Sequence, residues 1–237
     1  MKTILSGFIF LMCCSQYGQE KYNSWFKVVS KHTEGYLNYK VTKSYSSIYI
    51  SLDGRYRYGN QNMVLSDVAN IVSERDPLLP VKYFSTEATS DDLSKIPGKV
   101  SRYGMVSYLN DQQTWKANWT NRETITDYPT VALWNLPYIL TTLEYTEKGK
   151  LLELNVIQIN ELDYEKENYL EYVSDEVIVL DEKEVSVRKI ALRHENGQLY
   201  YWLDFENNIV QMRIDRTNLV KCARQDVPLD EFDWEVD

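Results

Sequence analysis

Few residues of this chain are of the types that carry out catalysis. Histidine occurs twice, at His32 and His194, and neither has a second His or Cys at metal-ligand spacing. Two of the three cysteines, Cys13 and Cys14, lie in an apolar N-terminal run, which leaves Cys222 as the remaining thiol. Cys222 lies in a strand-like pattern, which favours a buried and unreactive thiol. We therefore expect no metal site and no cysteine nucleophile.

Motifs for phosphate binding or acyl transfer are also missing from the sequence. There is no glycine-rich phosphate loop and no Gly-x-Ser-x-Gly motif. A Ser/His/Asp site stays open because its members are distant in sequence, but His194 precedes the hairpin signal Asn196-Gly197, which favours a surface position. Carboxylate pairs such as Glu161 with Asp163 arise by chance among 35 acidic residues. We expect no catalytic residues and no cofactor, and an enzyme is the least favoured function.

The chain begins with the pattern of a secretory signal. Lys2 precedes an apolar run over residues 4–14, which is shorter than the roughly 20 residues that a membrane-spanning helix needs. We predict a signal peptide over residues 1–19, cleaved between Ser15 and Gln19, and no transmembrane span. Lipidation at Cys13 or Cys14 stays open, although Leu11 and Met12 suit that processing poorly. A buried N-terminal strand or helix is the third interpretation.

The predicted mature chain, residues 20–237, is long enough for one mostly β domain with a substantial core. It keeps only Cys222, so it can form no internal disulfide. The net charge of -9 argues against nucleic acid and anionic membrane surfaces as partners. The acidic C-terminal tail, residues 230–237, has the composition of a solvated end.

Alternating apolar residues predict a succession of antiparallel strands. Asp53-Gly54 is typical of a turn, and Asn196-Gly197 is a strong hairpin signal. The spacing of Val64, Leu65, Val68, Ile71 and Val72 instead predicts a helix. The expected strands are 36–41, 48–52, 55–58, 81–84, 103–109, 115–119, 152–156, 168–174, 176–180, 185–194, 199–205, 209–216 and 219–224.

An apolar segment over residues 128–143 breaks the strand pattern. Pro129 suits the first turn of a helix, and Pro137 argues against one continuous helix. We predict two short helical turns that plug one end or face of the sheet. The fold class expected is mainly β: a curved antiparallel sheet or incomplete β-barrel, with a few short helices packed on or plugging it.

The apolar segment 133–140 and the hairpin strand 197–203, which carries Tyr201-Trp202-Leu203, resemble those of uncharacterised exported bacterial proteins with a domain of unknown function. Such proteins are similar in outline to the periplasmic lipoprotein carriers LolA and LolB. The resemblance covers residues 34–224 as a pattern of elements, and the polar region 85–127 has no counterpart. It implies a half-barrel whose helices close an apolar cavity, in the periplasm or at the outer membrane of a Gram-negative bacterium.

The function expected is therefore binding or carrying an apolar, lipid-like ligand in the cell envelope, with an envelope protein as a further partner. Whether each candidate lines a pocket or fills the core stays open at this stage. The candidates for the ligand-binding residues are Trp115, Trp119, Trp134, Leu136, Tyr138, Leu140 and Trp202.

The alternative is a glycan-binding or envelope-assembly module. It depends on the 19 tyrosines, because tyrosine has an apolar ring with a polar tip. If tyrosines near the N-terminus face solvent in a row, they could stack on sugar rings. Those tyrosines are Tyr36, Tyr45, Tyr49, Tyr56 and Tyr58.

Overall fold

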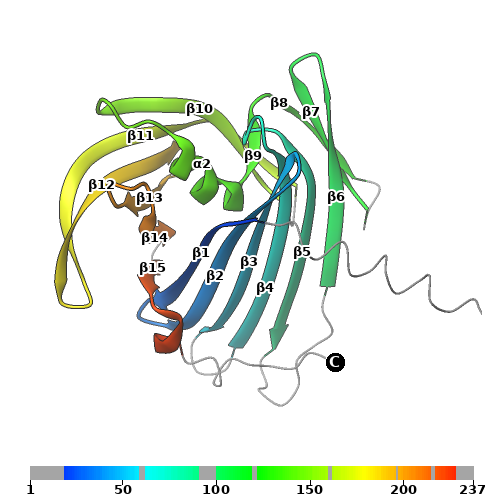
Figure 1. The fold of residues 1–237 in the computed structure, drawn as a ribbon. Helices are drawn as coiled ribbons and strands as arrows, with labels where there is room; N and C mark the ends of the chain where they lie inside the picture. The colour runs from blue at the N-terminus through cyan, green and yellow to red at the C-terminus, as the bar shows by residue number, and fades with distance from the viewer. Residues whose placement is uncertain are drawn as a thin grey trace, which may run out of the picture.

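A computed structural model of the protein describes residues 19–58, 62–90, 100–118, 122–159, 162–195, 197–214 and 217–227. In these residues a 15-stranded sheet curls into a barrel that is nearly closed (Figure 1). The first half of the sheet contains β1 (Gln19–Val29), β2 (Thr33–Ser44), β3 (Ser47–Tyr58), β4 (Asn62–Ser73), β5 (Pro80–Ser90), β6 (Val100–Leu109), β7 (Gln112–Ala117) and β8 (Glu123–Asp127). The second half contains β9 (Thr130–Ala132), β10 (Gly149–Gln158), β11 (Asp163–Leu180), β12 (Lys183–His194), β13 (Gly197–Leu203), β14 (Ile209–Ile214) and β15 (Thr217–Cys222).

Most strands follow one another as antiparallel neighbours, and the first and last strands meet in the middle of the sheet. β1 pairs with β2 on one side and with β15 on the other, so the two halves are joined by backbone hydrogen bonds. The exception to the antiparallel order is β9, which pairs with β10 in parallel. The two edges of the sheet are β8 and β9. The barrel is therefore interrupted at one seam, between two strands that are consecutive in the chain.

Side chains connect the seam where backbone pairing stops. Gln113 of β7 faces the inside of the barrel and is 0% exposed. Its amide nitrogen donates to the carbonyl oxygen of Thr130 at 2.9 Å, and its amide oxygen accepts from the Thr130 N–H. The N–H of Asp127 donates to the Tyr164 hydroxyl at 3.2 Å. A single side-chain amide thus reproduces the two hydrogen bonds that a neighbouring strand would make to Thr130.

A short helical segment lies inside the barrel. It consists of a 3₁₀ turn, η1 (Leu133–Asn135), followed by the helix α2 (Leu136–Thr142), and its residues Leu136, Ile139 and Leu140 belong to the main core. The Tyr39 hydroxyl of β2 donates to the carbonyl oxygen of Trp134 at 3.0 Å and accepts from the N–H of Tyr138 at 3.2 Å. Strand β2 therefore holds both sides of the junction between η1 and α2.

The predicted fold class is confirmed: the molecule is a curved, mainly antiparallel sheet with a short helix plugging it. Each predicted strand from 36–41 to 219–224 overlaps an observed strand, although 199–205 and 219–224 extend two residues past the ends of β13 and β15. Some boundaries were wrong. Asp53-Gly54 lies inside β3, paired with Asn38 and Leu37, and 168–174 and 176–180 form one strand with a bulge after Tyr172.

The predicted helix around Val64–Val72 is wrong, because this segment is strand β4. Val68, Asn70 and Val72 are buried, whereas Ala69 is exposed, which is the two-residue period of a strand. Asn70 makes this pattern hard to recognise in the sequence, because a polar side chain occupies an inward-facing position. Its amide nitrogen donates to the Asn135 side-chain oxygen at 2.7 Å, so a contact 65 residues away in the sequence explains it.

The segment 128–143 holds one helix and one 3₁₀ turn, which begin later than predicted. Pro129 does not open a helix but precedes the strand β9, after a cis peptide bond with Tyr128. Pro137 lies in the first turn of α2, where its missing N–H leaves no hydrogen bond unmade. The predicted signal peptide up to residue 18, Trp119 and the acidic tail at 230–237 lie outside the described residues.

Candidate functional site

The candidate site is an apolar cavity at one end of the barrel, with a volume of about 280 Å³. At this end β1 and β3 finish and β2 begins, and beside them β14 finishes and β15 begins. Its apolar wall consists of Val28, Leu37, Leu52, Trp134, Ile214 and Leu219. Its remaining lining residues are Thr33, Tyr36, Gly54, Tyr56 and Thr217.

The strand register explains why these residues meet. In β2 and β3, Leu37 pairs with Gly54, and both face inwards together with Leu52. Gly54 has no side chain at an inward position, which leaves space inside the barrel. Val28 of β1 pairs with Leu219 of β15, so the junction between the two halves of the chain forms the opposite wall.

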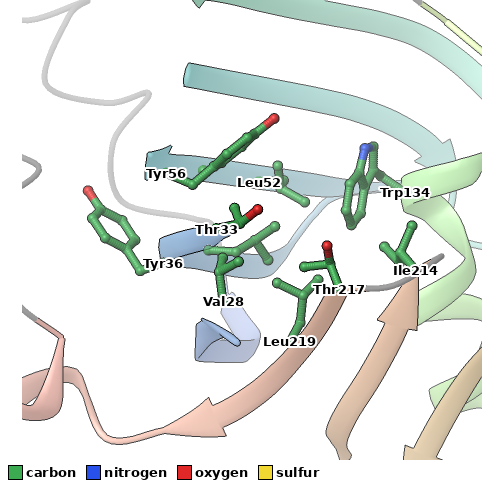
Figure 2. A pocket seen from close by; sticks show the side chains of 11 residues that line it. Val28, Thr33, Tyr36, Leu52, Tyr56, Trp134, Ile214, Thr217 and Leu219 are labelled. Carbon is green, nitrogen blue, oxygen red and sulfur yellow. The ribbon is translucent and has the colours of Figure 1, made fainter. Parts of the chain in front are cut away.

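Trp134 forms the inner end of the cavity. It belongs to η1, which the Tyr39 hydroxyl fixes through the Trp134 carbonyl oxygen. In Figure 2 the Trp134 ring and Tyr36 lie at opposite ends of the lining, with Leu52 and Thr33 between them. The helical plug therefore determines how deep the cavity reaches.

None of the described residues that line this cavity has a charged side chain. The polar side chains in its lining are the hydroxyl groups of Thr33, Thr217, Tyr36 and Tyr56. A buried carboxylate or ammonium group needs a charged or strongly hydrogen-bonding partner. The cavity is therefore suited to an uncharged, largely apolar group.

The structure separates the seven ligand-binding candidates. Trp134 lines the cavity, whereas Leu136 and Leu140 are buried in the core. Trp115 is 0% exposed and packs on Tyr83, with ring centroids 5.8 Å apart. Trp119 lies outside the described residues. That these residues bind a ligand stays a prediction.

Tyr138 and Trp202 do not line the cavity. Tyr138 is half-buried on α2. Trp202 lies on the outer face of β13 in a small cluster with Val187 and Val210. Its indole N–H donates to a carboxylate oxygen of Glu176 at 3.0 Å. Burial tends to raise the pKa of Glu176, but hydrogen bonds from Trp202, Lys189 and Ser174 outweigh it and lower that pKa.

The tyrosines of the alternative prediction do not form one exposed row. Tyr36 is buried, Tyr56 lines the cavity, and Tyr45 and Tyr49 are exposed. The side chain of Tyr58 lies outside the described residues.

Neither His32, His194 nor Cys222 lines the cavity. His194 Nδ1 is 3.6 Å from a carboxylate oxygen of Glu165. Cys222 is half-buried, and burial raises the pKa of its thiol, so it is protonated at neutral pH. Within the described ranges, no three His, Cys, Asp or Glu side chains gather to hold a metal ion, and no helix is long and apolar enough to cross a membrane.

Sequence reasoning missed most of the cavity lining. Thr33 and Thr217 are the first residues of their strands, and Val28, Leu37, Leu52 and Leu219 are ordinary inward positions. A glycine at an inward strand position is the one local signal, but Gly54 follows Asp53 and was assigned to a turn.

No family model and no curated protein matches this sequence. A solved structure of similar fold is a β-barrel-like protein of domain of unknown function DUF1849 from Brucella abortus. The similarity covers 84% of this chain and 93% of that protein, with a TM-score of 0.57 and 8% sequence identity. At this identity the similarity shows the fold alone: the chain is similar to a barrel-like protein whose own function is unknown.

Proposed function

We propose that this protein is a non-catalytic binding protein that holds an uncharged, lipid-like ligand in the cavity at the end of its barrel. The observation that carries the proposal is the composition of the cavity: six apolar side chains and no charged one line it. Burying an acyl chain there would gain about 0.8 kcal/mol for each methylene group.

The volume of the cavity limits the size of the ligand. Its volume of about 280 Å³ lies at the lower limit of roughly 300–1,000 Å³ for small-molecule sites. It can take part of one acyl chain or a small ring compound, and not the whole of a phospholipid. The hydroxyl groups of Thr33 and Thr217 can donate hydrogen bonds to the oxygen atoms of an ester or an alcohol. A medium-chain monoacylglycerol has both an acyl chain and the oxygen atoms of an ester and of alcohol groups.

We further propose that the protein is exported to the periplasm or the outer membrane, where it acts as a carrier or sensor in the manner of the lipoprotein carriers LolA and LolB. The apolar segment after Lys2 supports export. The intact mass of the protein purified from the cell envelope tests this. We expect an N-terminus between Ser15 and Gln19 and an extra mass that organic solvent removes. A chain that keeps Met1, or that carries no extractable mass, contradicts the respective part of the proposal.

The binding test is thermal unfolding with a medium-chain monoacylglycerol, the matching fatty acid and glycerol. Ligand at about 100 times its Kd should raise the Tm by roughly 5–10 °C for a domain of this size. The fatty acid should raise it less, because the carboxylate meets no cation in the cavity, and glycerol should have no effect. If the monoacylglycerol has no effect, the proposed ligand class is wrong.

A pair of variants locates the binding site. Thr33→Trp places a large ring at the cavity and should abolish the effect of the monoacylglycerol. Thr42→Trp puts the same ring on the outer face of the same strand and should leave that effect unchanged. Equal Tm shifts in both variants would place the ligand outside this cavity.

A further inference from the structure

A second hollow lies beside the seam of the barrel. It has a volume of about 500 Å³ and lies between the Tyr128-Pro129 peptide and the paired strands β10 and β11. We call it the seam groove. Its lining includes Tyr128, Lys150, Glu153, Glu167, Asn168 and Tyr169.

A bulge in the β10–β11 ladder forms one side of the seam groove. Leu154 pairs with Asn168, but the next pair is Val156 with Glu165, so β11 has one extra residue at this point. Glu167 takes up the irregularity with a φ of 58°. Such bulges interrupt pairing and redirect side chains, often next to binding sites.

A buried side-chain amide supports the wall of the groove from inside the barrel. Asn168 is 1% exposed, and its amide nitrogen donates to the Glu165 carbonyl oxygen at 2.9 Å. Its amide oxygen is buried and has no hydrogen-bond partner among the described residues. Asn168 pairs with Leu154, and both side chains are buried on the inward face of the sheet, so this amide supports the bulge from inside the barrel and does not contact a ligand in the groove.

Aromatic rings and paired charges complete the lining. Tyr169 is half-buried, and Tyr128 is exposed at the opposite side. The Lys150 ammonium group lies 5.1 Å from the centre of the Tyr169 ring and forms an ion pair with Glu153. Because Lys150 already has a partner, the groove offers no isolated cation to an anionic ligand. Glu167 adds a carboxylate, which repels acidic ligands.

This combination suits a ring that has an apolar face and a rim of hydroxyl groups. A pyranose can lay its C–H face on a tyrosine ring while its hydroxyl groups donate hydrogen bonds to carboxylate oxygens. A purely apolar ligand would instead leave the polar side chains without water or partners. We propose that the seam groove binds a pyranose ring of a neutral saccharide, independently of the apolar cavity that Trp134 lines.

NMR titration of the labelled full chain tests this proposal. The probes are glucose, galactose and N-acetylglucosamine, their β-linked disaccharides, and glucuronate as the acidic counterpart of glucose. We expect saturable shifts of backbone amides in residues 153–155 and 167–169 with a neutral sugar, and weaker binding of glucuronate. Saturation by monosaccharides indicates a free sugar as the ligand, whereas saturation by disaccharides alone indicates a unit of a polymer.

Variants at Tyr169 identify the contact. Tyr169→Ala removes the ring and should weaken binding roughly tenfold, whereas Tyr169→Phe should keep most of it. Tyr103→Ala is the matched control, because Tyr103 is 56% exposed on β6, away from the groove. If Tyr169→Ala does not fold, the shifts in the unaltered chain still locate the site. Absence of saturable shifts with every neutral sugar, shifts elsewhere, or unchanged binding by Tyr169→Ala would overturn the proposal.

Discussion

Gln113 and Asn70 are polar side chains at positions that face the inside of the barrel, where an apolar residue would be expected. Gln113 makes two hydrogen bonds to the backbone of Thr130, and Asn70 donates to Asn135. Both contacts hold the segment after the seam against strands that lie far from it in the sequence. Buried polar groups are retained where they have such partners, so these two residues position η1 and β9.

The seam contact predicts a large effect of Gln113→Leu. The substitution keeps a side chain of similar volume, but it leaves the N–H and the carbonyl oxygen of Thr130 buried without partners. Because each unsatisfied group costs about 1–3 kcal/mol, we expect the free energy of unfolding to fall by about 2–4 kcal/mol in urea titrations. Gln112→Leu, at the exposed neighbouring position, is the control. Equal losses in the two variants would contradict a role of Gln113 in the seam.

At the scale of elements, α2 is stable because of its surroundings and not because of its own sequence. It has seven residues, no side-chain cap and no acidic residue in its first turn. An isolated helix of this length is unstable in water. Its apolar side chains and the Tyr39 hydroxyl supply the missing stability through contacts with the barrel wall.

Shortening one of these side chains tests the dependence. Leu140→Ala removes a fully buried side chain and should lower the free energy of unfolding by about 2–5 kcal/mol. Thr142→Ala, at an exposed position of the same helix, should change it by less than about 0.5 kcal/mol. Denaturant titrations of both variants provide the comparison. A small loss in Leu140→Ala would mean that the plug is loosely packed.

At the scale of the whole molecule, the rolled sheet buries tyrosines from both of its halves. Tyr39 of β2 and Tyr201 of β13 are both almost fully buried. Burial raises the pKa of Tyr22 and of Tyr83 to about 12. Because the folded state favours the neutral ring, these tyrosines contribute stability that is fully present below their unfolded pKa of about 10.

The direction of the shift predicts how the protein unfolds in alkali. As the pH rises from 10 through 12, the unfolded state gains tyrosinate and stability should be lost. Tyrosinate absorbance and circular dichroism should therefore change together in that interval. Tyr83→Phe should lose less stability across it than the unaltered chain, whereas Tyr45→Phe should behave like the unaltered chain because Tyr45 is 82% exposed. An equal pH dependence in Tyr83→Phe would contradict the linkage.

The sequence by itself determined the mainly β class, most strand positions and the apolar interruption around residues 133–140, because these follow from local alternation and from proline. It misassigned β4, because the hydrogen-bond partner that explains a buried Asn70 lies 65 residues away in the sequence. It also misassigned Gly54, because a glycine inside a strand has the same local pattern as one in a turn.

Tertiary structure alone decided which residues meet. The cavity is lined by residues of six elements, namely β1, β2, β3, η1, β14 and β15. The seam groove depends on a bulge opposite Tyr128. Alternation identifies the inward face of a strand, but it is the same for a side chain that fills the core and for one that lines a hollow. Trp115 is part of the core and Trp134 lines the cavity, and the neighbours that the rolled sheet places beside each ring decide this difference.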